Sequence, residues 1–470
     1  MSSGFLKKSR ARTIALALGV GAISSFAMTG TSLAATPNAG AACQGADGKV
    51  GGRGATFQTN ATRALITGYT NDVCGVVAGG GTDFGNNMLA YNYANAVSNS
   101  GTGSGAGQKA TSCRTDAFAG TDIPYDQNTL NQLNGAPGTI TGGCSITWAP
   151  AANPTTGPWP NANDVQANVM SFPVAGSSVA VMVNLSAAAC GGTKPTALNF
   201  SANTVSKLFG GDYQTWNDPA LVAENASLAN CNIAISRFVR FDKSGTTQVF
   251  KNFLNNADGA RSGATCDPGN SWTNLALDAN NQTWPTGAGC TSLGRGASSG
   301  NPALITAMKA VDGSVGYSDL ADTVGSGLVL AGVRNATDTA YTSPANGLGA
   351  NCDFTTSLPG SSNADAVGLN TGDNWAFDNG TGVIHEDVTY KGSLYPICGL
   401  TFDFVFTGLN GNSGANNAIS RLTANQRRTL YSYFTYVFSA AGQSKLTSQR
   451  YAALPNGWLA KLRLGFQSSF

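Results

Sequence analysis

The chain has 470 residues, of which only 11% are charged, with 27 Lys and Arg against 25 Asp and Glu. The basic residues form no stripe along the sequence, which argues against nucleic acid and anionic membranes as partners. A single histidine, His385, and the lack of any Cys-x-x-Cys pair give no metal-binding or histidine-based catalytic motif. We therefore expect no metal, no cofactor and no catalytic residues.

The first 35 residues have the features of a cleaved export signal. Lys7, Lys8, Arg10 and Arg12 precede the apolar run "TIALALGVGAISSFAM", and small residues surround a cleavage point near Ala34. The apolar run is too short and too rich in Gly and Ser to span a bilayer comfortably. This pattern predicts a protein of the periplasm or one released outside the cell, with a net charge that changes from +2 to −2 on cleavage.

All ten cysteines follow this segment, and an even number in an exported chain predicts up to five disulfides. The spacing does not fix the pairing. Joining neighbours in the sequence costs the least chain entropy and gives the pairs 43–74, 113–144, 190–231, 266–290 and 352–398. A lipid on Cys43 is the alternative for that residue, but it would leave an odd number of cysteines.

The remaining sequence alternates strand-like and helix-like stretches, which is typical of an α/β protein. Residues 177–185 form a continuous apolar run expected of a buried strand, and 232–240 are a second strand candidate. Residues 205–216 resemble a short helix ended by Gly-Gly. In 424–440, apolar residues share one helical face: Leu430, Phe434, Val437 and Phe438.

Three other stretches are rich in Gly, Pro, Asn or Asp and are expected to be insertions or loops. They cover residues 149–163, roughly 256–290 and roughly 331–394, and each has a cysteine within or beside it. A mature chain of about 435 residues is also too long for one compact core, so we expect two lobes with insertions.

The stretch "RFDKSGTT" at 240–247 runs directly into a helical pattern, "QVFKNFL". The first turn of a helix has N–H groups without partners, and its dipole favours negative charge. Hydroxyls, a glycine and the planar donors of Arg240 would add to this. The stretch therefore indicates either a site for a small tetrahedral anion or an ordinary capped helix with a surface ion pair.

Three earlier stretches share this character: "GGRGATF" at 51–57, "GTGSGAG" at 101–107 and "TDAFAGTDIP" at 115–124. Further on come "KLFGGDYQTWNDPAL" at 207–221, "DGSVGYSDL" at 312–320 and "YAALP" at 451–455. In this order, over about residues 50 to 460, they closely resemble the motifs of the periplasmic phosphate-binding proteins of high-affinity phosphate ABC transporters (PstS-type).

The resemblance implies a two-lobed type II periplasmic-binding-protein fold with the ligand between the lobes. We place one lobe at 44–172 plus 397–470 and the other at 173–396, with the disulfides in loop insertions. The implied partners are inorganic phosphate and an ABC permease, and we expect a monomer. Matched motif by motif, the implied phosphate ligands are Thr56, Phe57, Ser104, Asp122, Arg240, Ser244, Gly245 and Thr246. Asp242 is expected to pair with Arg240 and hold it in place.

Asp122 is the residue expected to select the anion. Phosphate near neutral pH keeps a proton that a carboxylate can accept, whereas sulfate has none to offer. An unpaired buried group and like-charge repulsion would then discriminate against sulfate by on the order of 10⁴–10⁵. A simpler interpretation is that Asp122 only caps a turn.

Two residues depart from the family pattern. Arg53 stands where a small residue is frequent, and we expect it to point to solvent. Lys243 replaces a frequent glycine and is expected at the rim of the site. Two other functions stay open at this stage: a secreted scavenger or sensor of phosphate or another tetrahedral oxyanion, and a phosphatase-like enzyme with Ser104 or Ser244 as nucleophile.

Overall fold

The structure of the chain is a computed structural model that describes residues 43, 48–76, 86–92, 103–112, 116–122, 138–139, 147–148, 168–258, 272, 282–285, 300–354, 388–407 and 424–469. Contacts divide the chain into Met1–Pro37 and Asn38–Phe470, and everything described here belongs to the second unit. The expected export signal therefore lies outside the described residues. His385 and the stretch 149–163 lie outside them as well.

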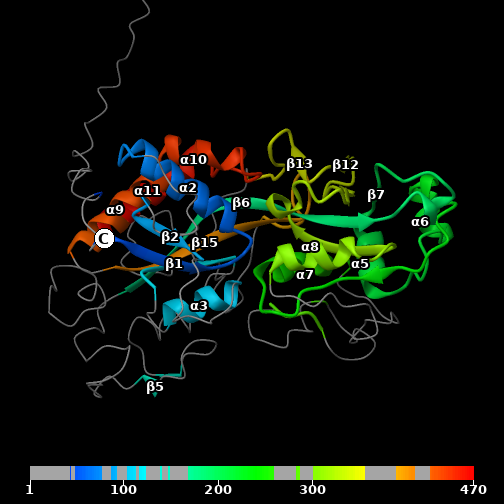
Figure 1. Cartoon of the computed structure of the whole chain (residues 1–470), viewed down its shortest axis with the longest axis horizontal. Coiled ribbons are helices and arrows are strands. Elements are labelled where there is room, and N and C mark those ends of the chain that lie inside the picture. The colour runs from blue at the N-terminus through cyan, green and yellow to red at the C-terminus, as the bar shows by residue number, and fades with distance from the viewer. Residues whose placement is uncertain are drawn as a thin grey trace, which may run out of the picture. The chain divides into compact units, whose positions relative to one another are not determined.

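The largest sheet has the strand order β2-β1-β3-β15-β6-β9-β8, and β10 also pairs with β6 (Figure 1). β1 is parallel to β2 and β3, and β8 is parallel to β9, whereas β15 is antiparallel to both of its neighbours. The strands are β1 Val50–Gly54, β2 Leu89–Tyr91, β3 Phe118–Thr121, β6 Asn168–Asn184, β8 Ser236–Arg237, β9 Ser314–Asp319, β10 Val329–Leu330 and β15 Cys398–Thr407.

β6 and β15 pass through two separate hydrophobic cores. Phe172 and Val174 of β6 pack in one, which we call the first core, while Val179 and Val181 pack in the other, the second core. A continuous apolar run was expected here because a strand buried along its length has no polar face to present to water. The pairing of β6 with β15 shifts register near Pro173, a residue that lacks the N–H of a regular ladder.

Four helices pack around the first core: α2 Thr59–Asp72, α9 Ala424–Val437, α10 Ala440–Thr447 and α11 Asn456–Ser469. The apolar face expected in 424–440 is confirmed, because Leu430, Phe434 and Val437 are fully buried and Phe438 nearly so. Rings of α9 meet Phe172 of β6 edge to face, at 5.0 Å between centroids for Phe434. The apolar stripe of α9 therefore fixes this helix on the sheet.

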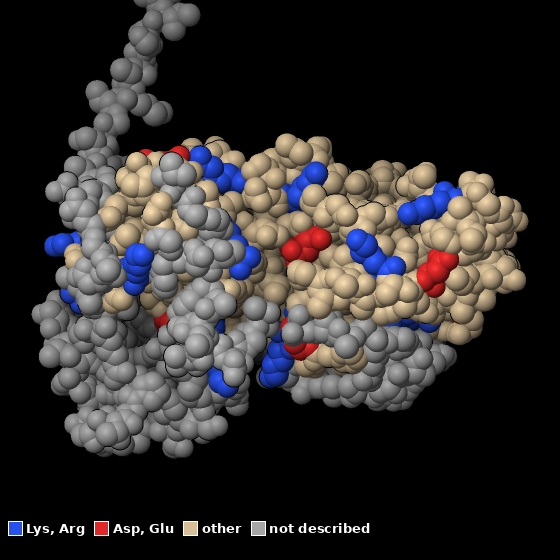
Figure 2. Space-filling view, viewed as in Figure 1, with Lys and Arg blue, Asp and Glu red and all other residues tan. Residues whose placement is uncertain are grey.

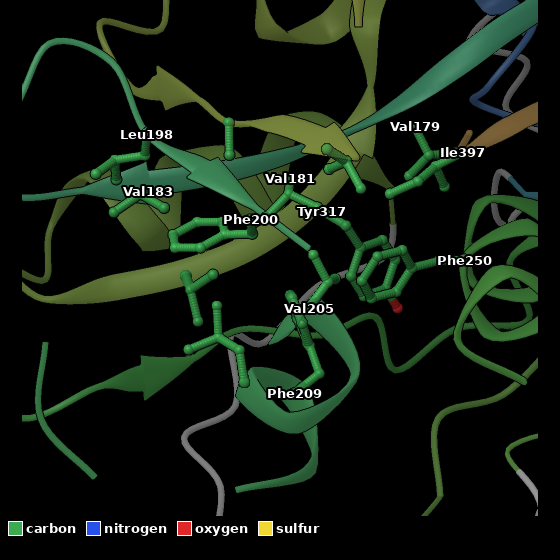
Figure 3. Close-up of a cluster of buried hydrophobic side chains, with 14 of the residues drawn as sticks. Val179, Val181, Val183, Leu198, Phe200, Val205, Phe209, Phe250, Tyr317 and Ile397 are labelled. Atoms are coloured by element: carbon green, nitrogen blue, oxygen red, sulfur yellow. The ribbon is translucent and has the colours of Figure 1, made fainter. Parts of the chain in front are cut away.

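The second core forms around α5 Ala202–Gly210, α6 Pro219–Glu224 and α7 Gly245–Ala257, with α8 Asn301–Lys309 beside it. Figure 3 shows Val179, Val181 and Val183 of β6 facing the rings of this core. α5 ends at Gly211 in a left-handed conformation, as the Gly-Gly pair predicted. In "WNDP", Asp218 accepts from the Ala220 N–H, so this motif is the start of α6.

Smaller strands complete the described structure. β7 Asn199–Phe200, β11 Gly332–Arg334 and β12 Tyr341–Thr342 form one sheet, β13 Ala345–Asn346 pairs with β14 Gly349–Ala350, and β4 Gly138–Thr139 pairs with β5 Thr147–Trp148. Single 3₁₀ turns cover Ala188–Cys190, Ala226–Leu228 and Leu320–Thr323.

Two expectations about local structure need correction. Residues 332–350, expected to be loop, contain β11 to β14, because β11 gains a distant partner strand at Asn199–Phe200. Within the strand candidate 232–240, only Ser236–Arg237 pairs as a strand. The Arg237 guanidinium turns inward to donate to the carbonyls of Leu208 and Tyr213, and the chain then leaves the sheet.

Three disulfides have the pairing of sequence neighbours: Cys43–Cys74, Cys190–Cys231 and Cys352–Cys398. The pairs 113–144 and 266–290 lie outside the described residues. Each native bridge contributes about 2–4 kcal/mol to the stability of the folded chain. Among the described residues, none of the helices combines the length and the apolar character needed to cross a membrane.

Candidate anion-binding site

Directly before α7, the buried Arg240 forms an ion pair with Asp242, which is partly exposed. The Arg240 side chain is fully buried, and its Nε donates to Asp242 Oδ1 over 2.6 Å while Nη2 pairs with the second oxygen. Two parallel contacts hold the guanidinium plane in one orientation. The remaining Nη1 donates to Asn301 Oδ1 and lies 3.4 Å from Thr56 Oγ1, so it faces residues from other parts of the chain.

The N-terminus of α7 supplies the neighbouring donors. Ser244 is the N-cap, and its Oγ accepts from the Thr247 N–H over 3.2 Å. The N–H groups of Gly245 and Thr246 belong to the first turn of α7, where backbone N–H groups find no acceptor within the helix. Within the described part of the chain, Thr246 Oγ1 is buried without a hydrogen-bond partner. These groups form a cluster of donors at the positive end of a helix dipole.

Ser104 and Asp122 face this helix from the first-core side. Ser104 is the first residue of α3 Ser104–Ser112; its Oγ donates to Asp122 Oδ2 over 2.9 Å and accepts from the Asp122 N–H over 3.0 Å. A Cβ added to Gly245 would come within 2.3 Å of Asp122 Cβ and 2.5 Å of Ser104 Oγ. Only glycine fits at this contact, so Asp122 and the start of α7 lie directly against each other.

The loop after β1 brings in Thr56 and Phe57, just before α2. Gly54 has φ +148°, and a Cβ there would lie 1.8 Å from the Gly120 carbonyl oxygen, so this loop packs on the strand that precedes Asp122. The Phe57 carbonyl accepts a hydrogen bond from the Tyr451 hydroxyl. The N-terminal residues of α3 and α7, Ser104 and Gly245, both lie against Asp122, and the first turn of a helix favours negative charge.

Asp122 places an acidic side chain among these donors. Its carboxyl accepts hydrogen bonds from hydroxyl groups. Its exposed fraction is 1%, and Oδ1 accepts from Thr401 Oγ1 over 2.9 Å. Burial raises the pKa of Asp122 to about 7, while the hydrogen bonds from Thr401 and Ser104 and the charge of Arg240 act in the opposite direction. Burial thus brings the pKa of this carboxyl toward neutrality, where it can exchange a proton with a bound anion.

The structure brings together every residue expected at the site: Thr56, Phe57, Ser104, Asp122, Arg240, Asp242, Ser244, Gly245 and Thr246. Lys243 is exposed, at the rim, as expected. Arg53 was expected in solvent, and that expectation is wrong. It is 7% exposed, and its Nε and Nη2 bind the carboxylate of Asp116, which provides the partner a buried guanidinium requires.

Several supporting residues were missed at the sequence level. Asn301 Oδ1 accepts from Arg240, and its Nδ2 donates to Asp319 Oδ1 over 2.8 Å. The Asp319 carboxyl meets the Tyr451 hydroxyl that holds Phe57. Burial raises the pKa of Asp319 well above its usual value. Asn301 is the first residue of α8 and follows Gly300, a sequence pattern that could have marked it as a helix start. No neighbouring residue in the sequence indicates its contact with Arg240.

A second buried group, Gln58, Thr401 and Asp403, lies behind Asp122. Gln58 Nε2 donates to Asp403 Oδ1 over 2.7 Å, and Thr401 lies between Gln58 and Asp122. Burial also raises the pKa of Asp403 to about 7. Alternation of polar and apolar residues in "LTFDFVF" at 400–406 was the available signal for these side chains.

The described residues contain no cluster of three or more His, Cys, Asp or Glu side chains that could hold a metal ion. On the face drawn in Figure 2, the charged residues of the described part are scattered among uncharged ones. Arg240 and Asp122, by contrast, are buried.

Residues 158–369 match the family described as a PBP superfamily domain. Together with the mixed α/β sheet and the two cores through which β6 and β15 pass, this match, over less than half of the chain, shows a fold similar to that of the PBP superfamily. The expected fold class is confirmed.

The chain is also similar in sequence to curated phosphate-binding proteins. The chain is 27% identical over 281 residues to the phosphate-binding protein PstS2 of Mycobacterium bovis (strain BCG / Pasteur 1173P2), covering 59% of this chain and 56% of the relative. It is 29% identical over 156 residues to the phosphate-binding protein PstS of Haemophilus influenzae, covering 33% and 40%. The chain is thus similar in sequence to PstS-type proteins, as its motifs predicted, and it spans a little over half the length of the mycobacterial relative.

Solved structures share the fold. A high-affinity periplasmic phosphate-binding protein, PfluDING, bound with phosphate, superposes with a TM-score of 0.54 at 20% identity over 88% of this chain and 93% of that one. An ancestral soluble variant of the human phosphate-binding protein superposes with a TM-score of 0.55 at 17% identity over the same shares. At these identities the likeness concerns the fold alone.

Proposed function

We propose that this chain is an exported solute-binding protein that captures inorganic phosphate non-covalently. The proposed ligand groups are the Thr56 hydroxyl, the Phe57 N–H, Ser104, Asp122, Arg240, Ser244, Gly245 and Thr246. Asp242 is proposed as the residue that holds Arg240 in place.

One observation carries this proposal: a buried acceptor, Asp122, lies directly opposite a buried cation and a helix N-terminus. Arg240 and the first turn of α7 attract any small oxyanion. A carboxyl facing the same point would repel a fully ionised anion but accepts the proton of a partly protonated one. Phosphate has the charge, the tetrahedral shape and the proton that this combination requires.

The proposed role in the cell is delivery of phosphate to an ABC permease, since the relatives are named PstS phosphate-binding proteins. We place the protein in the periplasm or outside the cell, after cleavage of the first 35 residues, and as a monomer. The lobes are proposed to comprise 44–172 plus 397–470 and 173–396, with the site formed between them.

Two alternative functions differ from this one in measurable ways. A secreted scavenger or sensor would bind phosphate, or another tetrahedral oxyanion, without a permease. A phosphatase would use Ser104 or Ser244 as nucleophile. The Ser244 hydroxyl caps α7 and the Ser104 hydroxyl donates to Asp122, so an activity assay is needed to separate a ligand role of these serines from a nucleophilic one.

Calorimetric titration of the ligand-free protein with phosphate, sulfate and arsenate tests the proposal. At about pH 9, where Asp122 is mostly ionised, we expect tight binding of phosphate, binding of arsenate because it carries a proton in the same pH range, and much weaker binding of sulfate. Equal affinity for sulfate and phosphate would contradict the assignment. Incubation with p-nitrophenyl phosphate is the parallel test for the enzyme, and release of p-nitrophenol at a catalytic rate would favour the phosphatase instead.

A further inference from the structure

Thr401 lies in the middle of β15, on the opposite face of the strand from the first core. Leu400 and Phe402 on either side of it are fully buried in that core. Successive side chains of a strand point to opposite faces, so Thr401 and Asp403 share the other face, toward Asp122 and Gln58. The position is fully buried, and the hydroxyl of Thr401 must therefore find its partner inside the protein.

The Thr401 hydroxyl has three acceptors within reach. Asp122 Oδ1 is 2.9 Å away, the Thr121 carbonyl oxygen is 3.3 Å away, and Gln58 Oε1 is also in contact. A hydroxyl has a single proton to donate. A hydrogen bond to an ionised acceptor is about twice as strong as one between neutral groups, so the carboxylate of Asp122 is the preferred acceptor whenever it is charged.

The charges around Asp122 come from several elements. Arg240 is the cation on the α7 side, and it favours the ionised carboxyl. Tyr91 of β2 and Asp403 of β15 are the titratable groups on the first-core side. Tyr91 is close enough to interact electrostatically with both Asp122 and Asp403. Burial raises the pKa of Asp122, and the Thr401 hydroxyl is the first of the opposing influences. Arg240 serves the ligand directly, whereas Thr401 contacts the site only through Asp122.

We propose that Thr401 is a specificity-determining residue of the anion site, whose hydroxyl holds the Asp122 carboxyl in the ionised form that accepts the proton of the ligand. This inference deepens the proposed function and rests on it. Thr401 is a positioning residue, because its hydroxyl contacts Asp122, Gln58 and the Thr121 carbonyl and acts on the ligand through Asp122.

Sulfate reports the protonation of Asp122 directly. Sulfate stays fully ionised throughout the neutral range, so it binds well only when the Asp122 carboxyl holds a proton and can donate it. The affinity for sulfate should be constant at low pH and fall about tenfold per pH unit above the midpoint at which Asp122 ionises. In the wild type we expect this midpoint near the pKa of about 7.

The experiment measures sulfate affinity from about pH 5 to about pH 9, by competition with radiolabelled phosphate, in the wild type and in Thr401→Val. Valine keeps the shape but removes the donor. We expect the midpoint to rise by about one pH unit, because a hydrogen bond to a charged group is lost. At pH 8 the ratio of sulfate affinity to phosphate affinity should rise about tenfold.

Two further variants control for structure. Thr401→Ser restores the hydroxyl and should return the midpoint to the wild-type value. Thr389→Val removes another buried threonine hydroxyl, which donates to the Cys398 carbonyl, and should leave the midpoint unchanged. If Thr401→Val does not fold, Thr401→Ala makes the same polar change without the added methyl and should show the same shift.

A wild type that binds phosphate selectively, with the same sulfate midpoint in Thr401→Val and Thr401→Ala, would overturn the role of Thr401 and leave the proposed function intact. This result would mean that the hydroxyl donates to Gln58 or to the Thr121 carbonyl. A wild type that binds neither anion would overturn both the proposed function and this inference. A shifted midpoint that Thr401→Ser fails to restore would also overturn the inference, since packing would then be the cause.

Discussion

Arg240 and Asp122 are both buried and lie on opposite sides of the same site, yet their charges are compensated very differently. Arg240 has a carboxylate partner in Asp242, held by two parallel contacts, and a further acceptor in Asn301. Asp122 accepts from two hydroxyls, those of Ser104 and Thr401, and burial raises its pKa to about 7. The Arg240 side of the site therefore has a fixed charge, whereas the charge of the Asp122 side depends on pH.

This difference divides the work of recognition. A permanently charged, oriented guanidinium beside a helix N-terminus attracts tetrahedral anions without regard to their protons. A carboxyl whose pKa burial has raised toward neutrality responds to whether the anion brings a proton. Affinity should therefore depend mainly on the Arg240 side and selectivity on the Asp122 side, and each of the following changes tests that division.

Arg240→Ala should produce the largest loss. Removing the guanidinium deletes a contact to the anion and leaves Asp242 without its partner, so phosphate affinity should fall by roughly tenfold to over a hundredfold. Titration calorimetry measures this directly. Arg334→Ala is the matched control, since Arg334 also pairs with an aspartate, Asp338, but on the surface. Affinity within a factor of about two of wild type for Arg240→Ala would refute the site assignment.

Asp122→Asn should change selectivity more than affinity. The amide has nearly the same shape, and its NH₂ can donate to a fully ionised oxygen, which the carboxylate cannot do. Sulfate should bind measurably better than to the wild type, while phosphate loses little or gains from the removed negative charge. Parallel titrations with both anions give the ratio. An unchanged ratio would mean that Asp122 serves only the turn in which it lies.

Asp403→Asn tests a buried carboxyl that lies behind the site, separately from the Asp122 carboxyl within the site. Burial raises the pKa of Asp403 to about 7, so the folded state keeps a proton that the unfolded chain releases above about pH 4. The free energy of unfolding of the ligand-free wild type should therefore lose about 1.4 kcal/mol per pH unit from this group as pH rises from about 4 to about 7.

The variant lacks this loss, so its stability relative to wild type should increase over the same interval and level off above pH 7. Urea unfolding at several pH values measures the difference. Asp338→Asn, at an exposed position, should show no such trend. A constant difference between variant and wild type from pH 4 to pH 7 would show that Asp403 is already ionised in the folded protein.

Asn301→Ala should have the smallest effect on binding. Arg240 would lose one acceptor but keep Asp242, so phosphate affinity should fall about fivefold, the equivalent of one net hydrogen bond of about 1 kcal/mol. In an Arg240→Ala background the same change should have no further effect on affinity. Asn335→Ala, at another buried asparagine, is the control that tests stability without touching the site. Additive losses in the double variant would show that Asn301 does not act through Arg240.

Local features of this protein could be predicted from the sequence because their causes lie within a few residues. Ser244 caps α7 from within one turn, and the Asp242 carboxylate reaches Arg240 from two residues away. The apolar face of α9 follows from its own periodicity. The three described disulfides join sequence neighbours, the arrangement that closes the shortest loops.

Features that join distant parts of the chain were decided only by the tertiary structure. Arg53 of β1 is buried because Asp116 arrives from the segment just before β3, and an arginine among glycines in the sequence gives no sign of that partner. β11 is a strand because Asn199–Phe200 lies beside it. Thr401 reaches Asp122 across 279 positions of sequence because β15 pairs with β3. Burial and hydrogen-bond partners depend on which segments pack together, and that packing sets the pKa of Asp122.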